Sequence, residues 1–209
     1  AAKFDGATAK ISTNGAIKLQ LNKPSFTLLN LAGSGSKTIE PVSGSNSFAA
    51  ALDATNVTIA STSSALTLGS STNTAAITSG KATSIAGPIN ISGGDVTVSA
   101  GLTGTTSTGS ITINSNGTFT DSAAISSAAG NQPTTIKADK AAITGTINSG
   151  SGVTSITGYT AGKTIDMGLV GDTTTTLALS NTELGTITAG TIRVGDSTSG
   201  NITVSAAIS

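Results

Sequence analysis

Short segments that begin with glycine recur along this chain and constrain its architecture more than any other feature. The motif Gly-x-(Ile/Val)-x-(Ile/Val) occupies residues 190–194 and again residues 200–204. Each copy places two β-branched side chains at positions i and i+2, so both point to one face of a strand while a polar residue points to the other. The Gly-Asp-Ser-Thr-Ser segment between the copies favours a chain reversal. Together with related segments at 87–91, 94–98 and 109–113, the pattern predicts a repeat protein of short strands.

The composition indicates a thin core. The 209 residues include 38 Thr, 30 Ser and 26 Gly, whereas aromatic residues make up 2% and charged residues 10%. A conventional globular core needs more large side chains than this, but a narrow coil filled by Ile, Val, Leu and Ala does not. The ten basic and ten acidic residues cancel, so nothing in the charge favours nucleic acid as a partner. No stretch approaches the roughly 20 apolar residues of a membrane span, so we expect no membrane insertion.

The spacing of apolar residues predicts an all-β fold, a right-handed parallel β-helix. Neighbouring apolar triplets lie too close together for a full coil, so we interpret them as successive faces of one coil, with apolar residues inside and Thr outside. One series recurs at intervals of 20 to 25 residues, which is a typical solenoid period; it comprises Leu66, Ile89, Ile111, Ile136, Ile156, Leu177 and Ile202. About seven coils at ~4.8 Å each would make a rod of about 35 Å. An immunoglobulin-type β-sandwich is the alternative.

Two segments are expected to differ in regularity. Residues 1–53 hold eight of the twenty charged residues and three of the four Phe, and we expect an irregular β-rich N-terminal segment there, either wider rungs, a cap or a lateral module. Residues 54–209 contain short apolar triplets throughout, and we expect parallel β-helix repeats there.

A resemblance to a known family is carried by the last third of the chain. Leu179-Ser180-Asn181-Thr182-Glu183-Leu184, the run from Ile187 to Asp196 and the segment from Ser199 to Val204 resemble repeats of filamentous-haemagglutinin-like adhesins and related autotransporter β-helix exoproteins. The similarity is greatest over residues 140–209 and looser back to about Asn56. It implies an extracellular β-helical rod on a bacterial cell surface, a stalk or fibre segment that serves adhesion or biofilm matrix formation. It implies no catalytic residue and no metal ligand, because the family motif contains none.

The residues themselves also give little reason to expect an enzyme. The chain has no His and no Cys, which removes imidazole acid–base chemistry, thiol nucleophiles and most transition-metal sites. We assign no catalytic, cofactor-binding or metal-binding residue and expect no cofactor. One alternative is a polysaccharide-cleaving β-helix enzyme, whose acidic groups would come from Asp166, Asp172, Glu183 and Asp196 with Arg193 nearby. In the ordinary interpretation these are turn residues and solvated charges.

Three weaker patterns complete the candidates. Gly93-Gly94-Asp95 resembles part of a calcium-binding nonapeptide, but it occurs once, whereas such nonapeptides are repeated in an array. Thr72-Asn73-Thr74 and Thr106-Ser107-Thr108 suggest an ice-binding β-solenoid, although Thr is also the common exposed residue of a strand. Lys137, Asp139 and Lys140 form a polar patch that we expect to be solvated.

The final strand, within residues 200–208, is apolar and has no charge or Pro to protect its edge. We therefore expect a partner there, either a neighbouring β-helix coil of the same long chain or an identical subunit added head to tail, which would build a filament. A host or matrix polysaccharide is the other expected partner. Lysine at Ile202 and Val204 is expected to disrupt this coil by burying unpaired charge.

Overall fold

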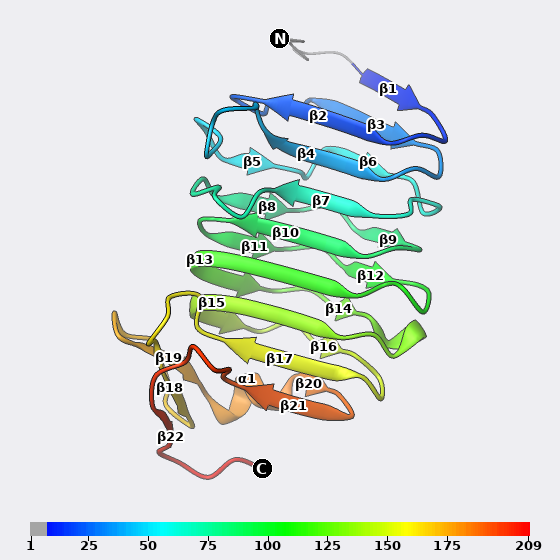
Figure 1. Cartoon of the computed structure of the whole chain (residues 1–209). Helices are drawn as coiled ribbons and strands as arrows, with labels where there is room; N and C mark the ends of the chain where they lie inside the picture. Colours follow the sequence, from blue (N-terminus) through cyan, green and yellow to red (C-terminus); the bar gives the residue numbers. More distant parts are fainter. Residues whose placement is uncertain (1–7) are drawn as a thin grey trace.

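The computed structural model describes residues 8–209, which form a parallel β-solenoid of about seven turns (Figure 1). Seen from the N-terminal end, the chain winds clockwise as it moves away, so the solenoid is right-handed (Figure 1). Every strand pair among the described residues is parallel, from the first pair, β1 with β3, to the last, β18 with β22. The predicted right-handed β-helix is thus confirmed, and the β-sandwich alternative, which needs antiparallel sheets, is wrong.

Most of the strands lie on three faces of the solenoid. The first face stacks β2 (Ile17–Leu21), β4 (Lys37–Pro41), β7 (Leu66–Gly69), β10 (Ile89–Gly93), the first halves of β13 (Ile111–Asp121) and β15 (Thr134–Ile143), β17 (Val153–Thr157) and β21 (Thr191–Val194). The second stacks β5 (Leu52–Asp53), β8 (Ile77–Ser79), β11 (Val96–Val98) and the second halves of β13 and β15. The third holds β1 (Thr8–Ser12), β3 (Leu28–Ala32), β6 (Val57–Ile59), β9 (Thr83–Ile85), β12 (Leu102–Gly104), β14 (Ile125–Ser126), β16 (Ile147–Asn148) and β20 (Ile187–Thr188).

The core consists of columns in which each interior side chain lies above its counterpart one turn later. The longest column runs through the first face, and its pairs come directly from the strand register: Leu19, Ile39, Leu68, Ile91, Ile113, Ile136, Ile156 and Val194. The predicted series is confirmed in two parts: Leu66 pairs with Ile89 and Ile89 with Ile111, in the neighbouring interior column, and Ile136 pairs with Ile156 in the longest column. It is wrong between these parts, because Ile111 pairs with Thr134 whereas Ile136 pairs with Ile113.

The last two members of the predicted series do not belong to this column. Leu177 and Ile202 both pair with Ile165 of β18 (Thr164–Met167), in a separate sheet with the order β19-β18-β22. There β19 (Thr176–Leu179) contacts β15, while β22 (Ile202–Val204) lies on the far side of β18. The residue that follows Ile156 in the longest column is Val194. This turn is 38 residues long, because residues 158–190 contain the additional strands β18 and β19.

The N-terminal strands belong to the same stack. The pairs of β2 with β4 and of β4 with β7 continue the first-face columns without a break. Irregularity lies in loop length instead, since Leu68 follows Ile39 by 29 residues whereas Ile113 follows Ile91 by 22. From residue 8 onward the described part of this segment pairs with the following coils. Residues 1–7 lie outside the described residues.

Some threonines lie inside the coil, contrary to the predicted Thr-outside pattern. Thr134 and Thr154 are fully buried at interior positions of the first face. Their hydroxyls lie 3.0 Å from those of Ser127 and Ser149, respectively, which are also fully buried. A buried hydroxyl without a hydrogen-bond partner is destabilising. The hydroxyl of a serine five to seven residues earlier gives each of these threonines that partner.

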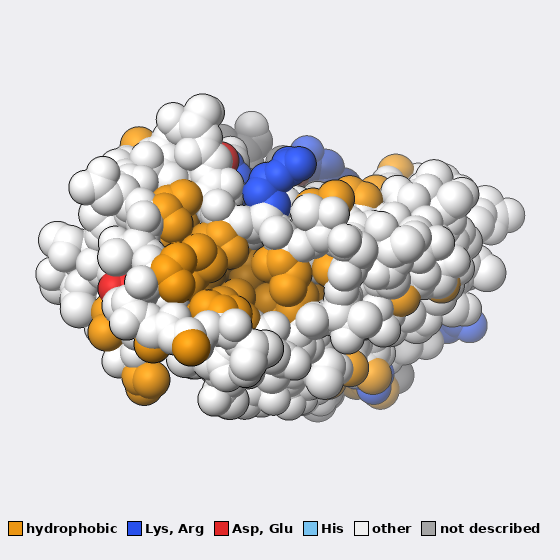
Figure 2. Space-filling view, turned by 90° about the horizontal axis from the view of Figure 1, so that it is seen from below, with side chains coloured by type: hydrophobic (Ala, Val, Ile, Leu, Met, Phe, Trp, Pro, Cys, Tyr) orange, Lys and Arg blue, Asp and Glu red, His pale blue; other side chains and the backbone are white. Residues whose placement is uncertain are grey.

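The C-terminal end of the stack exposes an apolar hollow (Figure 2). Its volume is about 530 Å³, and its lining includes Met167, Leu184, Ile187, Ile192, Val194 and Ile208. Ile202 and Val204 are 47% and 59% exposed, so the expectation that lysine at these positions would be buried and disruptive is wrong for the structure as it stands. The described residues contain no helix long and apolar enough to cross a membrane; the α-helix α1 (Asn181–Gly185) has five residues.

Lys37→Ala tests whether a buried lysine can serve as a core residue. Lys37 is fully buried between Ile17 and Leu66, and its Nζ donates hydrogen bonds to the carbonyls of Gly33, at 3.1 Å, and Gly35. Because truncation leaves a cavity, we expect chemical denaturation to show a loss of about 2–4 kcal/mol in the free energy of unfolding. Lys37→Met keeps the volume and should lose less than about 1 kcal/mol. Equal losses would show that the carbonyl contacts outweigh the packing.

Asp121→Asn tests a buried carboxyl in the column between Val98 and Ile143. Its Oδ1 accepts the Ala123 N–H at 3.2 Å, but its Oδ2 has no hydrogen-bond partner among the described residues, and burial raises the pKa of Asp121 to about 6. The folded state therefore binds the proton that the unfolded state releases near pH 4, and this group's contribution falls as pH rises from about 4 to about 6, by roughly 3 kcal/mol in total. We expect the Asn variant to be more stable than the parent at pH 8, with the difference vanishing near pH 3. Parallel pH profiles of thermal stability would contradict this.

Candidate functional site

Two of the four carboxylates that could have formed an acidic active site are bound to the backbone instead. Asp172 accepts the Ala178 N–H on Oδ1 at 2.7 Å and the Ala141 N–H on Oδ2 at 2.9 Å. Glu183 accepts the Ile143 N–H on Oε1 at 3.2 Å. These contacts fasten the edge of β15 to the segment around β19, where the two strands are in contact without a ladder of their own.

The helix α1 explains how Glu183 is placed. Ser180 is its N-cap, and the Ser180 hydroxyl accepts the Glu183 N–H at 3.2 Å while Glu183 Oε2 accepts the Ser180 N–H at 2.9 Å. This capping box fixes the carboxylate at the start of the helix. Burial raises the pKa of Asp172, an effect that the Ala178 and Ala141 N–H groups partly offset and that the charge of Glu183 reinforces.

The two remaining acidic candidates, Asp196 and Asp166, lie in different surroundings. Asp196 is exposed in a turn, where the Thr198 hydroxyl and N–H donate to Oδ1 at 2.7 and 2.9 Å and lower its pKa to about 2. Lys137 is its ion-pair partner at 3.5 Å. Asp166 lies on β18, and its Oδ1 is buried without a partner among the described residues. Within residues 8–209, no three acidic side chains gather as a metal site would require.

The weaker patterns are also turn and loop structure. Asp95 of the glycine-rich segment accepts the Thr118 N–H at 2.7 Å, one coil away. Thr72 and Thr74 lie in the loop between β7 and β8, whereas Thr106 and Thr108 lie between β12 and β13, at another corner of the coil. The structure therefore does not bring the two threonine segments into one array. In the polar patch, Asp139 Oδ1 accepts the Thr160 N–H at 2.8 Å, and Lys140 lines a shallow hollow with Lys163.

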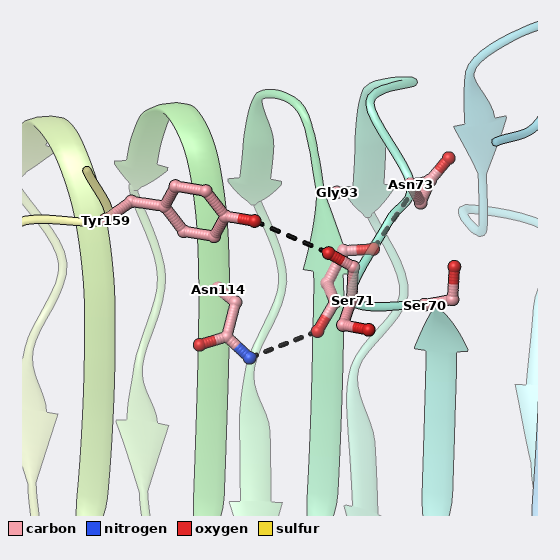
Figure 3. A pocket seen from close by; sticks show the side chains of 7 residues that line it. Ser70, Ser71, Asn73, Gly93, Asn114 and Tyr159 are labelled. Atoms are coloured by element: carbon pink, nitrogen blue, oxygen red, sulfur yellow. Dashed lines mark hydrogen bonds between the residues drawn. The ribbon is translucent and has the colours of Figure 1, made fainter. Parts of the chain in front are cut away.

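A polar cleft lies beside the ends of the first-face strands, and sequence reasoning missed it (Figure 3). We call it the Tyr159 cleft; its volume is about 200 Å³, and it is lined by Ser70, Ser71, Asn73, Ser92, Gly93, Asn114 and Tyr159. Ser70 and Ser71 come from the loop after β7, while Tyr159 comes from the loop after β17 and reaches back along the stack. The Tyr159 hydroxyl donates to the Ser71 carbonyl at 3.4 Å, across 88 residues of sequence.

Hydrogen bonds hold both walls of the cleft in place. Asn73 is buried, and its Oδ1 accepts the N–H groups of Phe48 and Ala75 while its Nδ2 donates to the Ser92 carbonyl at 3.3 Å. On the opposite wall, Asp139 binds both the N–H and the hydroxyl of Thr160, the residue after Tyr159. The only signal for this site in the sequence is that Tyr159 is the single tyrosine of a chain with almost no aromatic residues.

The chemistry that this cleft can support is binding. Its lining has hydroxyls, carboxamides and one phenol but no Lys, Arg, Asp or Glu, so it presents neutral hydrogen-bond donors and acceptors. A scan against protein-family models and searches of curated proteins and of solved structures found no match to this chain.

Replacement of Asp172 tests whether its carboxylate has a structural or a catalytic role. We expect Asp172→Ala to lower the free energy of unfolding by about 2–3 kcal/mol, because two partly buried N–H groups lose a charged acceptor. Asp172→Asn should lose less, since its remaining oxygen still accepts one of the two bonds. Asp196→Ala is the exposed control and should cost less than about 1 kcal/mol. Neither alanine variant should change the turnover of acidic polysaccharides, and turnover by the parent chain that disappears in these variants would prove the structural interpretation wrong.

Proposed function

We propose that this chain is a structural rod, a stalk or fibre segment of an extracellular bacterial adhesin, and that it serves cell-surface attachment or biofilm matrix formation without enzymatic activity. The observation that carries the proposal is the uninterrupted stack of about seven turns in which the interior columns hold the fold together and the flanks are mostly Ser, Thr and Asn. Such a stack gains length by adding coils, each of which contacts only its neighbours. The resemblance of residues 140–209 to filamentous-haemagglutinin-like repeats supports the same function.

The apolar C-terminal hollow supports a further stacked coil as the partner in this rod. Ile192 and Val194 pair with Thr154 and Ile156 and so occupy interior positions. In earlier turns the same positions are covered by the turn that follows. Ile192 is nevertheless 41% exposed. A coil of the same kind, with apolar residues in alternating positions, would bury this surface and complete the backbone hydrogen bonds of β21.

The rod proposal is tested on cells that express the protein. Antibodies raised against residues 8–209 should label intact cells, and deletion of the gene should reduce their attachment to a surface, with restoration by the parent gene as the control. Labelling that requires permeabilised cells, or attachment that is unchanged by deletion, would contradict the proposal.

Ile202→Lys with Val204→Lys tests whether β22, the last strand of the sheet β19-β18-β22, also accepts a stacked coil. Because both side chains are about half exposed, we expect the double variant to keep the thermal stability of the parent within the small range typical of surface substitutions, about 0.5 kcal/mol per site. If an identical subunit supplies the next coil, sedimentation should show association of the parent that increases with concentration and that the variant lacks. A large loss of stability in the variant at low concentration would show that these strands are already covered.

A further inference from the structure

We propose that the Tyr159 cleft binds an uncharged pyranose, one ring of a neutral polysaccharide or glycan. This goes beyond the structural role and does not rest on it, since a rod can be stiff whether or not its flank binds sugar. Four properties of the cleft carry the proposal: an aromatic ring with an accessible face, unused polar groups around it, the absence of charge and the absence of an open strand edge.

The ring of Tyr159 is available to a ligand. It is 38% exposed and spans the cleft toward Ser71 (Figure 3). Its hydroxyl bond to the Ser71 carbonyl, at 3.4 Å, is longer than the 2.5–3.0 Å that is usual for O–H···O bonds. A sugar hydroxyl can therefore replace this weak partner at little cost. The apolar C–H face of a pyranose fits against an aromatic ring, which combines an apolar face with a polar tip.

Polar groups surround the ring with free capacity. Asn114 Nδ2 donates to Ser92 Oγ at 3.1 Å, which orients the carboxamide and leaves its Oδ1 without a partner among residues 8–209. The Ser71 hydroxyl likewise makes no hydrogen bond within the described residues, and the Ser70 hydroxyl has only Thr72 Oγ1 at 3.3 Å. The cleft thus offers an acceptor and two hydroxyls beside one ring, the combination that sugar hydroxyls satisfy.

The other ligand classes fit this cleft less well. An anionic polysaccharide needs basic groups, and none lines the cleft. An extended peptide would add to a free strand edge, but β7, β10 and β13 each pair on both sides. The volume of about 200 Å³ is below the ~300–1,000 Å³ of pockets that enclose drug-sized ligands, so the cleft accommodates one ring at a time and a longer chain would lie along the flank.

The lone tyrosine makes the test direct. The chain has one Tyr and no Trp, so tyrosine fluorescence reports on this ring alone. The probes are the methyl pyranosides of glucose, galactose, mannose and N-acetylglucosamine, added to the whole chain. We expect at least one to change the emission saturably, with a dissociation constant on the order of 1 mM. Emission that does not change saturably with any of these probes would overturn the proposal.

Variants identify the groups responsible, with binding measured by calorimetry or saturation-transfer NMR. Tyr159→Phe keeps the ring and should bind within about threefold of the parent, whereas Tyr159→Ala and Asn114→Ala should each lose about tenfold or more. Asn90→Ala is the matched control, because Asn90 lies on β10 two residues from Ser92 and outside the cleft. Thermal stability equal to that of the parent shows that each variant is folded.

Several results would contradict the assignment. Binding that survives Tyr159→Ala, or that Asn90→Ala reduces as much as Asn114→Ala does, would place the sugar elsewhere. Binding of polygalacturonate or a sulfated glycan that weakens with salt, without any response to the neutral probes, would show that charge rather than the tyrosine platform selects the ligand. None of these outcomes bears on surface labelling or attachment of cells, so failure of the sugar site leaves the rod proposal to its own test.

Discussion

Parallel register is the constraint on which the rest of this molecule depends. Because each strand pairs in register with the strand one coil away, each interior side chain must stack on its counterpart, and branched apolar residues satisfy that requirement from Ile39 to Ile156. Some polar residues in the columns have local compensation, as Thr134 does through Ser127 and Lys37 through two glycine carbonyls. Asp121 has only partial compensation, which is why burial raises its pKa.

The sequence predicts these columns well where the coil length is constant and fails where an extra strand enters. Intervals of 20 to 25 residues follow from the length of one turn, so Leu66, Ile89 and Ile111 could be aligned by spacing alone. Leu177 follows Ile156 at the same interval, yet it pairs with Ile165. In this region β19 lies between β15 and β18, although it comes after β18 in the chain. Spacing along a sequence carries no information about such a reversal of spatial order.

The acidic residues show a second limit of sequence reasoning. Four carboxylates within about thirty residues are compatible with an active site, with turns or with edge contacts, because residue type alone does not say which donors lie opposite. The structure places Asp172 and Glu183 against the N–H groups of Ala141 and Ile143. Both carboxylates accept hydrogen bonds at the edge of β15, which β19 contacts without forming a ladder with it. The same irregularity therefore explains both why Leu177 and Ile202 leave the predicted series and why the carboxylates of Asp172 and Glu183 bind the backbone.

The Tyr159 cleft follows from this argument as well. A regular solenoid flank is nearly flat, because successive strands carry side chains of similar length in register, and a flat surface encloses no ligand. Concavity arises where loops depart from the repeat, here after β7 and after β17, and hydrogen bonds to Asn73 and Asp139 hold those departures in place. Since the columns already stabilise the fold, an exposed aromatic ring over this cleft is free to serve binding. We therefore propose that ligand specificity resides where the repeat is broken, while the regular coils supply length and stability.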